Sequence, residues 1–358
     1  MSIKKIAKEA GVSTATVSRV LNNPGYKCSS EELRERIWKI ARELNYMPNE
    51  AARNLKKGIT NTSQKVWYLD VLMTRTGNLE TDPFFSELLR VIESEIHRQG
   101  CILMHIFHQP LFSNDRKCRT ENIDKVIAQM EPDGEIRSDG LIIIGKCNDN
   151  VLKKLSAKYR SIVSVNRNST NYLVDEVICD GKRIAAMAVE YLIGLGHRKI
   201  GYVGDCHNES RYKGYQDTLF QYGIDMDISF VIEAEHTEAE GYAVMERLIQ
   251  RGDAPTAIYC ANDMIAIGML KCLNRYSSIL YRPSIISCDD IEEGQFIKPM
   301  LSTVQLPKEN MARFALFVLL DRIRGGHKEV IRIELEGKLL LRSSCCRVED
   351  VSQPEYYI

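Results

Sequence analysis

Hydrophobic residues recur every three to four positions in the first 46 residues of the chain. This spacing predicts amphipathic helices, because it places the apolar side chains on one face. Gly11 separates the first helix from the second, and the Asn-Asn-Pro-Gly run at 22–25 separates the second from the third. Ser13 and Ser30 are expected to cap the second and third helices. The apolar stripes are Ile3, Ile6, Ala7 and Ala10; Val17, Val20 and Leu21; and Leu33, Ile37, Ile40, Ala41 and Leu44.

A short polar segment follows this helical region. Residues 49–57 have the composition of a helix whose single large apolar residue is Leu55, and Gly58 ends it. Residues 59–65 are polar and are expected to form a linker. A lone leucine in so short a polar helix has no hydrophobic core of its own to join, so it either contacts a partner or packs against the rest of the chain.

From residue 66 onward, apolar strand-like runs alternate with helical stretches. Regular alternation of this kind predicts parallel sheets covered by helices, an α/β fold. Two sets of strands indicate two doubly wound parallel-sheet subdomains, in which ligands bind beyond the carboxyl ends of the strands. Strands are expected at 66–73, 101–107, 140–144, 162–165, 199–203, 257–260 and 284–288, and helices at 84–99, 151–158, 181–195, 211–222, 239–251, 264–274 and 308–324.

The charge of the chain is zero overall but uneven along its length. Residues 1–58 carry 12 Lys and Arg against 6 Asp and Glu, so the larger remainder is mildly acidic. A small basic region on an acidic body favours a module that binds a polyanion. The 11 cysteines are scattered, without the spacing of a zinc site, and are expected to be reduced thiols. No signal-like segment or apolar run of about 18–20 residues occurs, so a cytoplasmic protein without a membrane span is expected.

Residues 11–22 suggest how the basic region binds its polyanion. They read Gly-Val-Ser-Thr-Ala-Thr-Val-Ser-Arg-Val-Leu-Asn, a helix rich in small hydroxyl side chains around Arg19. Two helices joined by a glycine turn form a helix-turn-helix, whose second helix enters the major groove of DNA. Hydroxyls donate to phosphates, and an arginine can pair with guanine. From this stretch alone, an amphipathic helical hairpin with incidental hydroxyls remains an equal alternative.

Residues 3–22, together with the Leu-Asn-Tyr-Met-Pro-Asn run at 44–49, resemble the headpiece of the lactose-repressor (LacI/GalR) family of bacterial transcription regulators. The resemblance covers nearly the whole chain. It implies a helix-turn-helix DNA-binding domain at 1–46, a hinge helix and linker at 47–65, and a periplasmic-binding-protein-like core at 66–358. Within that core it implies an N-subdomain at 66–166 and 304–326 and a C-subdomain at 167–301 and 327–345.

The resemblance also assigns contacts with double-stranded operator DNA. Thr14 and Ala15 occupy the positions that choose bases, with Arg19 as a third. Leu55 occupies the position at which a leucine from each subunit wedges into the central minor-groove step. The remaining implied DNA-binding residues are Ser13, Thr16, Ser18 and Asn22, which are expected to contact phosphates, and Asn49 and Ala52 of the hinge helix.

In the core, the resemblance implies a cleft that binds a small-molecule effector, expected to be a sugar. Phe84 and Phe85 could supply an aromatic platform for the apolar face of a sugar ring. His236 stands where many relatives have a stacking aromatic residue, and a surface histidine is its alternative interpretation. Asn166 departs from the aspartate that is common at its position. The hydrogen-bonding residues implied are Asn166, Arg167, Arg211, Asn262, Asp289 and Gln305; structural hydrogen bonding is the alternative for this set.

No motif of an enzyme is present. The Gly-Leu-Gly run at 194–196 follows a helix, whereas a dinucleotide fingerprint requires a strand before the glycines. No catalytic residue, metal or cofactor is therefore expected. The chain is expected to be a sequence-specific transcriptional regulator, a repressor by resemblance, that acts as a homodimer under allosteric control by its effector. A regulator that senses a purine, a sugar phosphate or a partner protein remains an alternative, as does a solute receptor that does not bind DNA.

Overall fold

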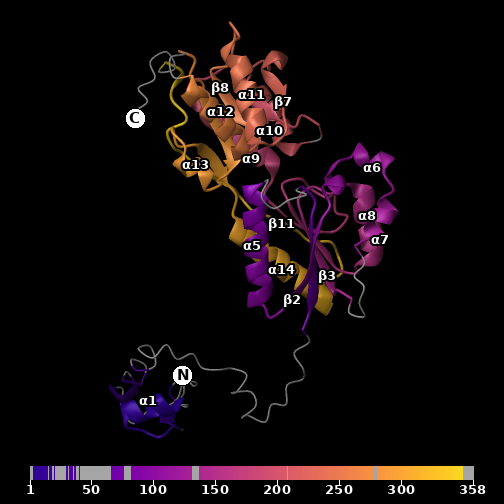
Figure 1. The fold of residues 1–358 in the computed structure, drawn as a ribbon, viewed down its shortest axis with the longest axis vertical. Coiled ribbons are helices and arrows are strands. Elements are labelled where there is room, and N and C mark those ends of the chain that lie inside the picture. The colour runs from indigo at the N-terminus through magenta and orange to yellow at the C-terminus, as the bar shows by residue number, and fades with distance from the viewer. Residues whose placement is uncertain are drawn as a thin grey trace. The chain divides into compact units, whose positions relative to one another are not determined.

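The computed structural model describes residues 3–14, 16–17, 20, 30, 32–34, 36–37, 40, 66–75, 82–130, 137–207, 209–276 and 280–349. The chain divides into two compact units, residues 1–65 and residues 66–358. The second unit contains two six-stranded sheets (Figure 1). This arrangement confirms the predicted α/β class. The predicted hinge helix and linker at 47–65 lie outside the described residues.

The first unit has a small hydrophobic core. Helix α1 (Ile3–Ala10) ends at Gly11, whose positive φ of 66° suits a residue without a Cβ. The Ser13 hydroxyl accepts a hydrogen bond from the backbone N–H of Thr16 at 3.1 Å, which confirms Ser13 as a helix cap. Ser30 accepts in the same way from the N–H of Leu33. The buried core residues are Ile6, Ala7, Ala10, Val17, Val20 and Ile37.

The first sheet of the second unit is parallel throughout, in the strand order β11-β5-β4-β3-β1-β2. Its central strands are almost fully apolar, as expected where helices cover both faces of a sheet. The strands are β1 (Tyr68–Met73), β2 (Ile102–His108), β3 (Gly140–Ile144), β4 (Ile162–Asn166), β5 (Asp175–Ile178) and β11 (Arg332–Glu334).

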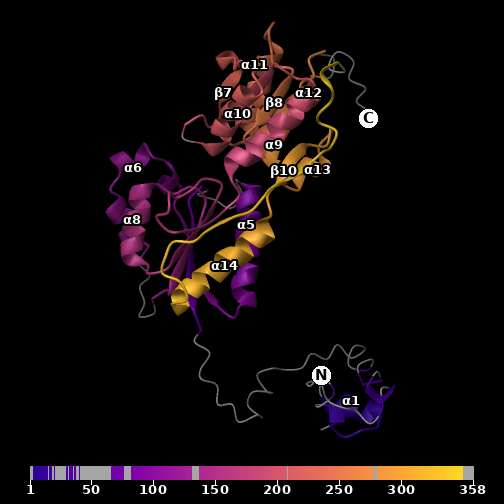
Figure 2. The same cartoon turned by 180° about the vertical axis from the view of Figure 1, so that it is seen from behind.

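Alternate residues of this sheet face two different helix layers. Ile142 and Ile144 of β3 belong to the core beneath α5 (Pro83–Arg98) and α14 (Lys308–Arg324), two helices that lie side by side (Figures 1 and 2). Leu141 and Ile143 belong instead to the core beneath α7 (Ile123–Ala128) and α8 (Asp149–Lys158). A short 3₁₀ turn (Pro110–Ser113) and α6 (Lys117–Thr120) complete this subdomain.

The second sheet has the order β12-β10-β9-β8-β6-β7 and is parallel except where β12 pairs with β10. Its helices pack in two pairs, α9 with α10 and α11 with α12. The strands are β6 (Ile200–Gly204), β7 (Val231–Glu233), β8 (Ala257–Cys260), β9 (Ser284–Asp289), β10 (Ser302–Gln305) and β12 (Lys338–Leu340). The helices are α9 (Gly181–Gly194), α10 (Ser210–Gln221), α11 (Glu238–Ile249), α12 (Asp263–Arg275) and α13 (Glu293–Phe296), with a 3₁₀ turn at Ile228–Phe230.

The chain crosses between the two sheets three times, and these crossings differ from the expected subdomain limits. They fall between β5 and α9, between β10 and α14, and between β11 and β12. Residues 175–178 and 332–334 therefore belong to the first sheet, although both were expected in the C-subdomain. The reason is that β5 and β11 are short and charged, so their hydrophobic pattern did not mark them as strands. Two of these crossings, after β5 and after β11, lie side by side, since the N–H of Leu335 donates to the carbonyl of Ile178 at 2.8 Å.

All seven strands and all seven helices predicted in the core are present, with ends shifted by one or two residues. Within the described part of the chain, no helix is both long and apolar enough to span a membrane. The ten cysteines that lie there are free thiols. No group of His, Cys, Asp or Glu side chains among these same residues has the arrangement of a metal site.

Candidate functional site

Polar side chains gather where strands of both sheets end. Arg75 follows β1 and Arg167 follows β4, both from the first sheet, whereas Asn262 follows β8 and Asp289 ends β9 in the second sheet. The carboxyl ends of parallel strands are the usual ligand-binding edge of doubly wound sheets. The structure therefore brings residues that are far apart in the sequence to one region between the subdomains.

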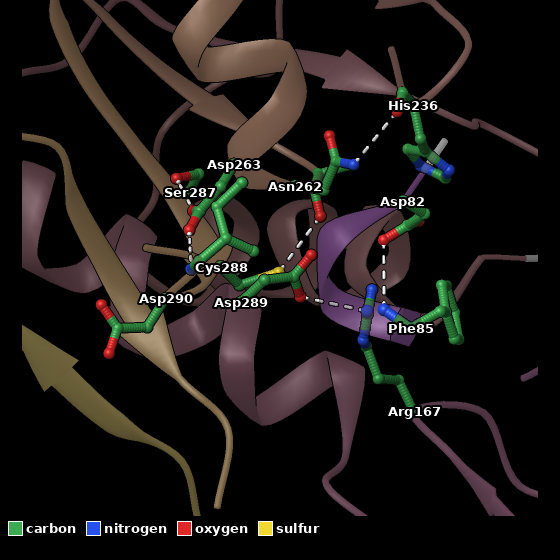
Figure 3. Close-up of polar contacts among 12 residues, drawn as sticks. Asp82, Phe85, Arg167, His236, Asn262, Asp263, Ser287, Cys288, Asp289 and Asp290 are labelled. Atoms are coloured by element: carbon green, nitrogen blue, oxygen red, sulfur yellow. Dashed lines mark hydrogen bonds and ion pairs between the residues drawn. The ribbon is translucent and has the colours of Figure 1, made fainter. Parts of the chain in front are cut away.

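An ion pair between Arg167 and Asp289 joins the two sheets. Nη2 of Arg167 lies 3.0 Å from Oδ1 of Asp289, and both side chains are buried (Figure 3). The guanidinium of Arg167 also stacks over the ring of Phe84, 4.4 Å from its centroid. Phe85 meets Phe84 edge to face, with ring centroids 5.2 Å apart. The structure thus brings four of the predicted ligand-binding residues into one cluster.

Asp289 has an unusual backbone conformation. Its φ is 131° and that of Asp290 is 52°, so two consecutive non-glycine residues have positive φ. Such conformations are costly and occur disproportionately at functional sites. The carboxylate of Asp263 holds the turn that follows, because it accepts hydrogen bonds from the Ile291 N–H at 2.9 Å and the Thr303 hydroxyl at 2.7 Å. Burial, with the nearby charge of Asp289, raises the pKa of Asp263 to about 7.

Arg211, a predicted ligand donor, already forms an ion pair with Glu209. Its Nε lies 2.9 Å and its Nη2 3.0 Å from the two carboxylate oxygens of Glu209. Its Nη1 donates to the carbonyl of Ala261. Burial alone would raise the pKa of Glu209, but the Arg211 charge outweighs it and the pKa lies well below its usual range. In this conformation Arg211 holds Glu209 and the backbone at Ala261, and most of its N–H groups already have acceptors.

Asn262 and His236 are linked to each other. The Asn262 side chain caps α12 by accepting from the N–H of Ile265 at 3.1 Å, and its Nδ2 donates to the His236 carbonyl at 3.3 Å (Figure 3). The Nδ1 atom of His236 is hydrogen-bonded to Nη2 of Arg75 from the facing subdomain. Burial, together with the charge of Arg75, lowers the pKa of His236 well below its usual value, so the ring is neutral. Its Nε2 atom is buried and has no hydrogen-bond partner among the residues that the structure describes.

Asn166 and Gln305 lie at strand ends, as predicted for ligand-binding residues. Their side chains, however, form hydrogen bonds with neighbouring residues of the chain. The Asn166 side chain accepts from the Arg167 N–H at 2.7 Å and donates to the carbonyl of Asn168 at 3.2 Å. Nε2 of Gln305 donates to Oδ2 of Asp290 at 2.7 Å, on the side of the turn away from the Arg167 pair. The structure therefore does not bring Gln305 to the aromatic cluster.

Lys308 and Asp82 belong to the cluster although the sequence analysis did not select them. The buried Nζ of Lys308 lies 2.5 Å from Oε2 of Glu87 on α5 and donates to the carbonyls of Asp289 and Asp290, each at 3.3 Å. Asp82 caps α5 by accepting from the Phe85 N–H, and burial next to Asp289 raises its pKa to about 6.

Two further residues, Arg75 and Glu209, were not selected either, and of the two only Arg75 had a signal in the sequence. Arg75 directly follows a predicted strand, which is the criterion that selected Arg167 and Asn262. Glu209 and Lys308 had none, because a carboxylate two residues before an arginine, or a lysine at the start of a helix, is ordinary at a protein surface.

A pocket of about 770 Å³ borders the cluster. Asn166 and Arg167 line it on one side, together with residues 146–150 after β3, Asp180 before α9 and Ser210 of α10. Its volume is in the range of small-ligand sites. Residues of both subdomains line the pocket, so a molecule bound there would contact Arg167 and residues of both subdomains.

In the first unit, the structure describes three of the predicted DNA-binding residues. The side chains of Ser13 and Thr14 are exposed, and Thr16 is half-buried with its hydroxyl 2.9 Å from that of Ser13. Val17 and Val20, on the opposite face of the same segment, are buried in the core. The remaining predicted DNA-binding residues, Ala15, Ser18, Arg19, Asn22, Asn49, Ala52 and Leu55, lie outside the described residues.

Two family models match the chain. Residues 2–49 match the bacterial regulatory proteins of the lacI family, and residues 189–345 match a periplasmic binding protein-like domain. The transcriptional repressor MelR of Bacillus subtilis is 30% identical and aligns with 98% of this chain and 99% of its own length. The chain belongs to the lacI family. PurR, a transcriptional repressor of Haemophilus influenzae strain PittEE, is 29% identical across 96% of this chain and 98% of its own length.

Solved structures of lacI-family regulators share the fold. A complex of the transcriptional regulator CelR with cellobiose superposes with a TM-score of 0.66, at 22% identity over 96% of this chain and all of that one. A lacI-family regulator from Enterococcus faecium with bound ribose gives a TM-score of 0.63, at 24% identity over 78% of this chain and 99% of that one. Family membership makes this chain a ligand-controlled, DNA-binding transcriptional regulator, and its named relatives are repressors.

Proposed function

We propose that this lacI-family protein is a homodimeric repressor whose operator affinity is set by a small polyhydroxylated effector, a sugar or sugar derivative, bound between the two sheets. The observation that carries this proposal is the Arg167–Asp289 ion pair stacked on Phe84. An aromatic ring can take the apolar face of a sugar, and a charged pair can take its hydroxyls. The sugars bound to the CelR and Enterococcus faecium regulators support the same ligand class.

The ion pair also provides a way for a bound ligand to control operator affinity. Arg167 and Asp289 belong to different sheets, and three chain crossings connect those sheets. A ligand that inserts between the two side chains changes the balance between open and closed arrangements of the subdomains. It alters operator affinity only by its difference in affinity for the two arrangements.

The test uses the full-length chain and an operator selected from random duplexes. Operator affinity is measured by fluorescence anisotropy with and without members of a sugar panel, for the wild type, Arg167→Met and Asp289→Asn. Lys199→Met is the matched control, because Lys199 forms an exposed ion pair with Asp253 on the second subdomain. We expect a panel member to change operator affinity in the wild type and in the control, and to have no effect in the two cleft variants. Equal responses in all four proteins would exclude this cleft.

The dimer is tested separately by light scattering. We expect a mass of about twice the 40.9 kDa of one chain, since a dimer places one helix-turn-helix on each half-site of a palindromic operator. A stable monomer that still binds a palindromic operator, or a stable tetramer, contradicts this part of the proposal.

A further inference from the structure

Arg75 is a cation in the cleft that no carboxylate among the described residues pairs with at close range. None of the ion pairs between described residues includes Arg75, whereas Arg167 is paired with Asp289 and Arg211 with Glu209. The hydrogen-bond partner of Arg75 in that part of the chain is Nδ1 of His236, a neutral ring. A poorly solvated cation without a close counter-charge is costly, and a bound anion would offset that cost.

The nearest carboxylates are committed elsewhere. Glu209 and Asp82 act on Arg75 through space. Both oxygens of Glu209, however, accept hydrogen bonds from Arg211. Asp82 caps α5 through the N–H of Phe85. Neither carboxylate therefore occupies the position beside the Arg75 guanidinium that an anionic ligand group would take.

His236 offers a second unused donor at the same place. Because the Arg75 guanidinium can only donate, Nδ1 of His236 must accept, and the proton of the neutral ring then lies on Nε2. This Nε2–H is buried and finds no acceptor in the described part of the chain. A buried donor without a partner is rare in folded proteins, and an acceptor on a ligand would satisfy it.

Asp289 can accept a further hydrogen bond at Oδ1. This atom lies 3.0 Å from Nη2 of Arg167 but is out of line with the N–H, so the contact is an ion pair, and no described residue donates a hydrogen bond to Oδ1. A hydroxyl of a ligand can donate to this atom. The cluster therefore offers a ligand the cation of Arg75 and the Nε2–H donor of His236. It also offers the acceptor of Asp289, whose partner Arg167 stacks on the ring of Phe84.

We infer that the effector is a hydroxylated compound with an anionic group, a carboxylate or a phosphate, which binds Arg75 and the Nε2–H of His236 while one of its hydroxyls donates to Asp289. This inference rests on the proposed function and narrows its ligand class from sugars in general to sugar acids and sugar phosphates. Arg75 follows β1 and His236 lies between β7 and α11, so the anion bridges the two subdomains. Binding of the anion therefore favours a defined arrangement of the subdomains.

The test compares matched ligands on the full-length chain by thermal shift and calorimetry. The probes are glucose, gluconate, glucose 6-phosphate and inorganic phosphate. Phosphate at about 20 mM is expected to stabilise the wild type, because a ligand that binds only the folded state raises its stability. Whichever of gluconate and glucose 6-phosphate fits is expected to bind at least about tenfold more tightly than glucose, as a charged hydrogen bond allows. The gluconate and glucose 6-phosphate arms distinguish a carboxylate from a phosphate.

Variants locate the site. Arg75→Met is expected to abolish the preference for the anions, and His236→Phe to weaken it, while Lys199→Met leaves it unchanged. Arg75→Lys keeps the charge and is expected to retain part of the preference for anions. It is the variant used to test the site if Arg75→Met does not fold. The inference is overturned if no anion stabilises the wild type, if glucose binds as tightly as its anionic derivatives, or if Arg75→Met keeps the anion preference.

Operator binding, measured in parallel, separates this inference from the proposed function. If a neutral sugar changes operator affinity through Arg167 and Asp289 but not through Arg75, the proposed function stands and the anion inference fails. If anions bind through Arg75 without any change in operator affinity, the binding site stands and the proposed function fails.

Discussion

The guanidinium of Arg167 lies 3.0 Å from the carboxylate of Asp289 and connects the end of β4 in one sheet with the end of β9 in the other. Both side chains are buried, and Asp289 has a positive φ of 131°. A buried charge pair is costly to break because it leaves the remaining charge unpaired. This pair therefore links the stability of the core to the arrangement of its two subdomains.

Removing both partners of this pair is expected to destabilise the core by less than the two single losses added together. Arg167→Met and Asp289→Asn should each lower the free energy of unfolding by about 3 kcal/mol. The double variant should lose less than the sum of the two, because no uncompensated charge remains. Urea denaturation of the full chain measures all three. Strict additivity would show that Arg167 and Asp289 do not interact in solution.

Lys308 is expected to couple α5 to the turn at Asp289 and Asp290. Its buried ammonium binds Glu87 of α5 and the two carbonyls of that turn. Lys308→Met keeps the length of the side chain and removes all three interactions. We expect a loss of about 2 kcal/mol in unfolding free energy and a weaker effect of any bound ligand on operator affinity. Lys271→Met is the control, since Lys271 forms an exposed pair with Glu238. Equal losses in both variants would remove any special role for Lys308.

The stability of the core is expected to depend on the pH through Asp82. Its folded pKa is raised to about 6 by burial and by Asp289. A carboxyl whose pKa is raised on folding stabilises fully below its unfolded pKa of about 3.9, and this contribution is lost as the pH rises through the folded pKa. The contribution of Asp82 should therefore fall between about pH 4 and pH 6, by roughly 3 kcal/mol at most.

Asp82→Asn isolates this effect. Asparagine is as good a helix cap as aspartate, so the cap on α5 is retained while the titrating group is removed. The difference in unfolding free energy between wild type and variant, measured by urea denaturation from pH 4 to pH 7, should shift in favour of the variant as the pH rises. A difference that stays constant over this range would contradict the raised pKa.

In the headpiece, base choice and phosphate binding are expected to separate. Thr14→Gln and Ala15→Gln should change which operator is preferred, since these residues stand at base-choosing positions by the family resemblance and Thr14 is exposed. Ser18→Ala should weaken binding to all duplexes to a similar degree, because phosphate contacts are independent of sequence. Selection from random duplexes, followed by affinity measurements, distinguishes the two outcomes. An unchanged preference in both glutamine variants would mean that this helix does not choose the operator sequence.

The sequence predicted the strands and helices that have a strong apolar pattern. Strand β3, with five apolar or glycine residues, and helix α14, with its long stripe, both lie where the pattern placed them. Strands β5, β7, β10, β11 and β12 were not predicted. The charged residues of β5 and β11 lie in the sheet because these strands pair with neighbouring strands, not because they have a hydrophobic pattern. Pairing partners that lie about 160 residues apart leave no local signal.

The sequence by itself determined the alternation of strands and helices, the positions of polar residues at strand ends and the family of the chain, because these depend on local spacing and local residue types. Only the tertiary structure decided which of those polar residues are free. In the folded chain Arg211 forms an ion pair with Glu209, and Arg167 forms one with Asp289. Gln305 is hydrogen-bonded to Asp290, and Arg75 is hydrogen-bonded to His236. The physical reason is that hydrogen bonds and ion pairs in a buried site are set by distances between separate elements, which only folding brings together.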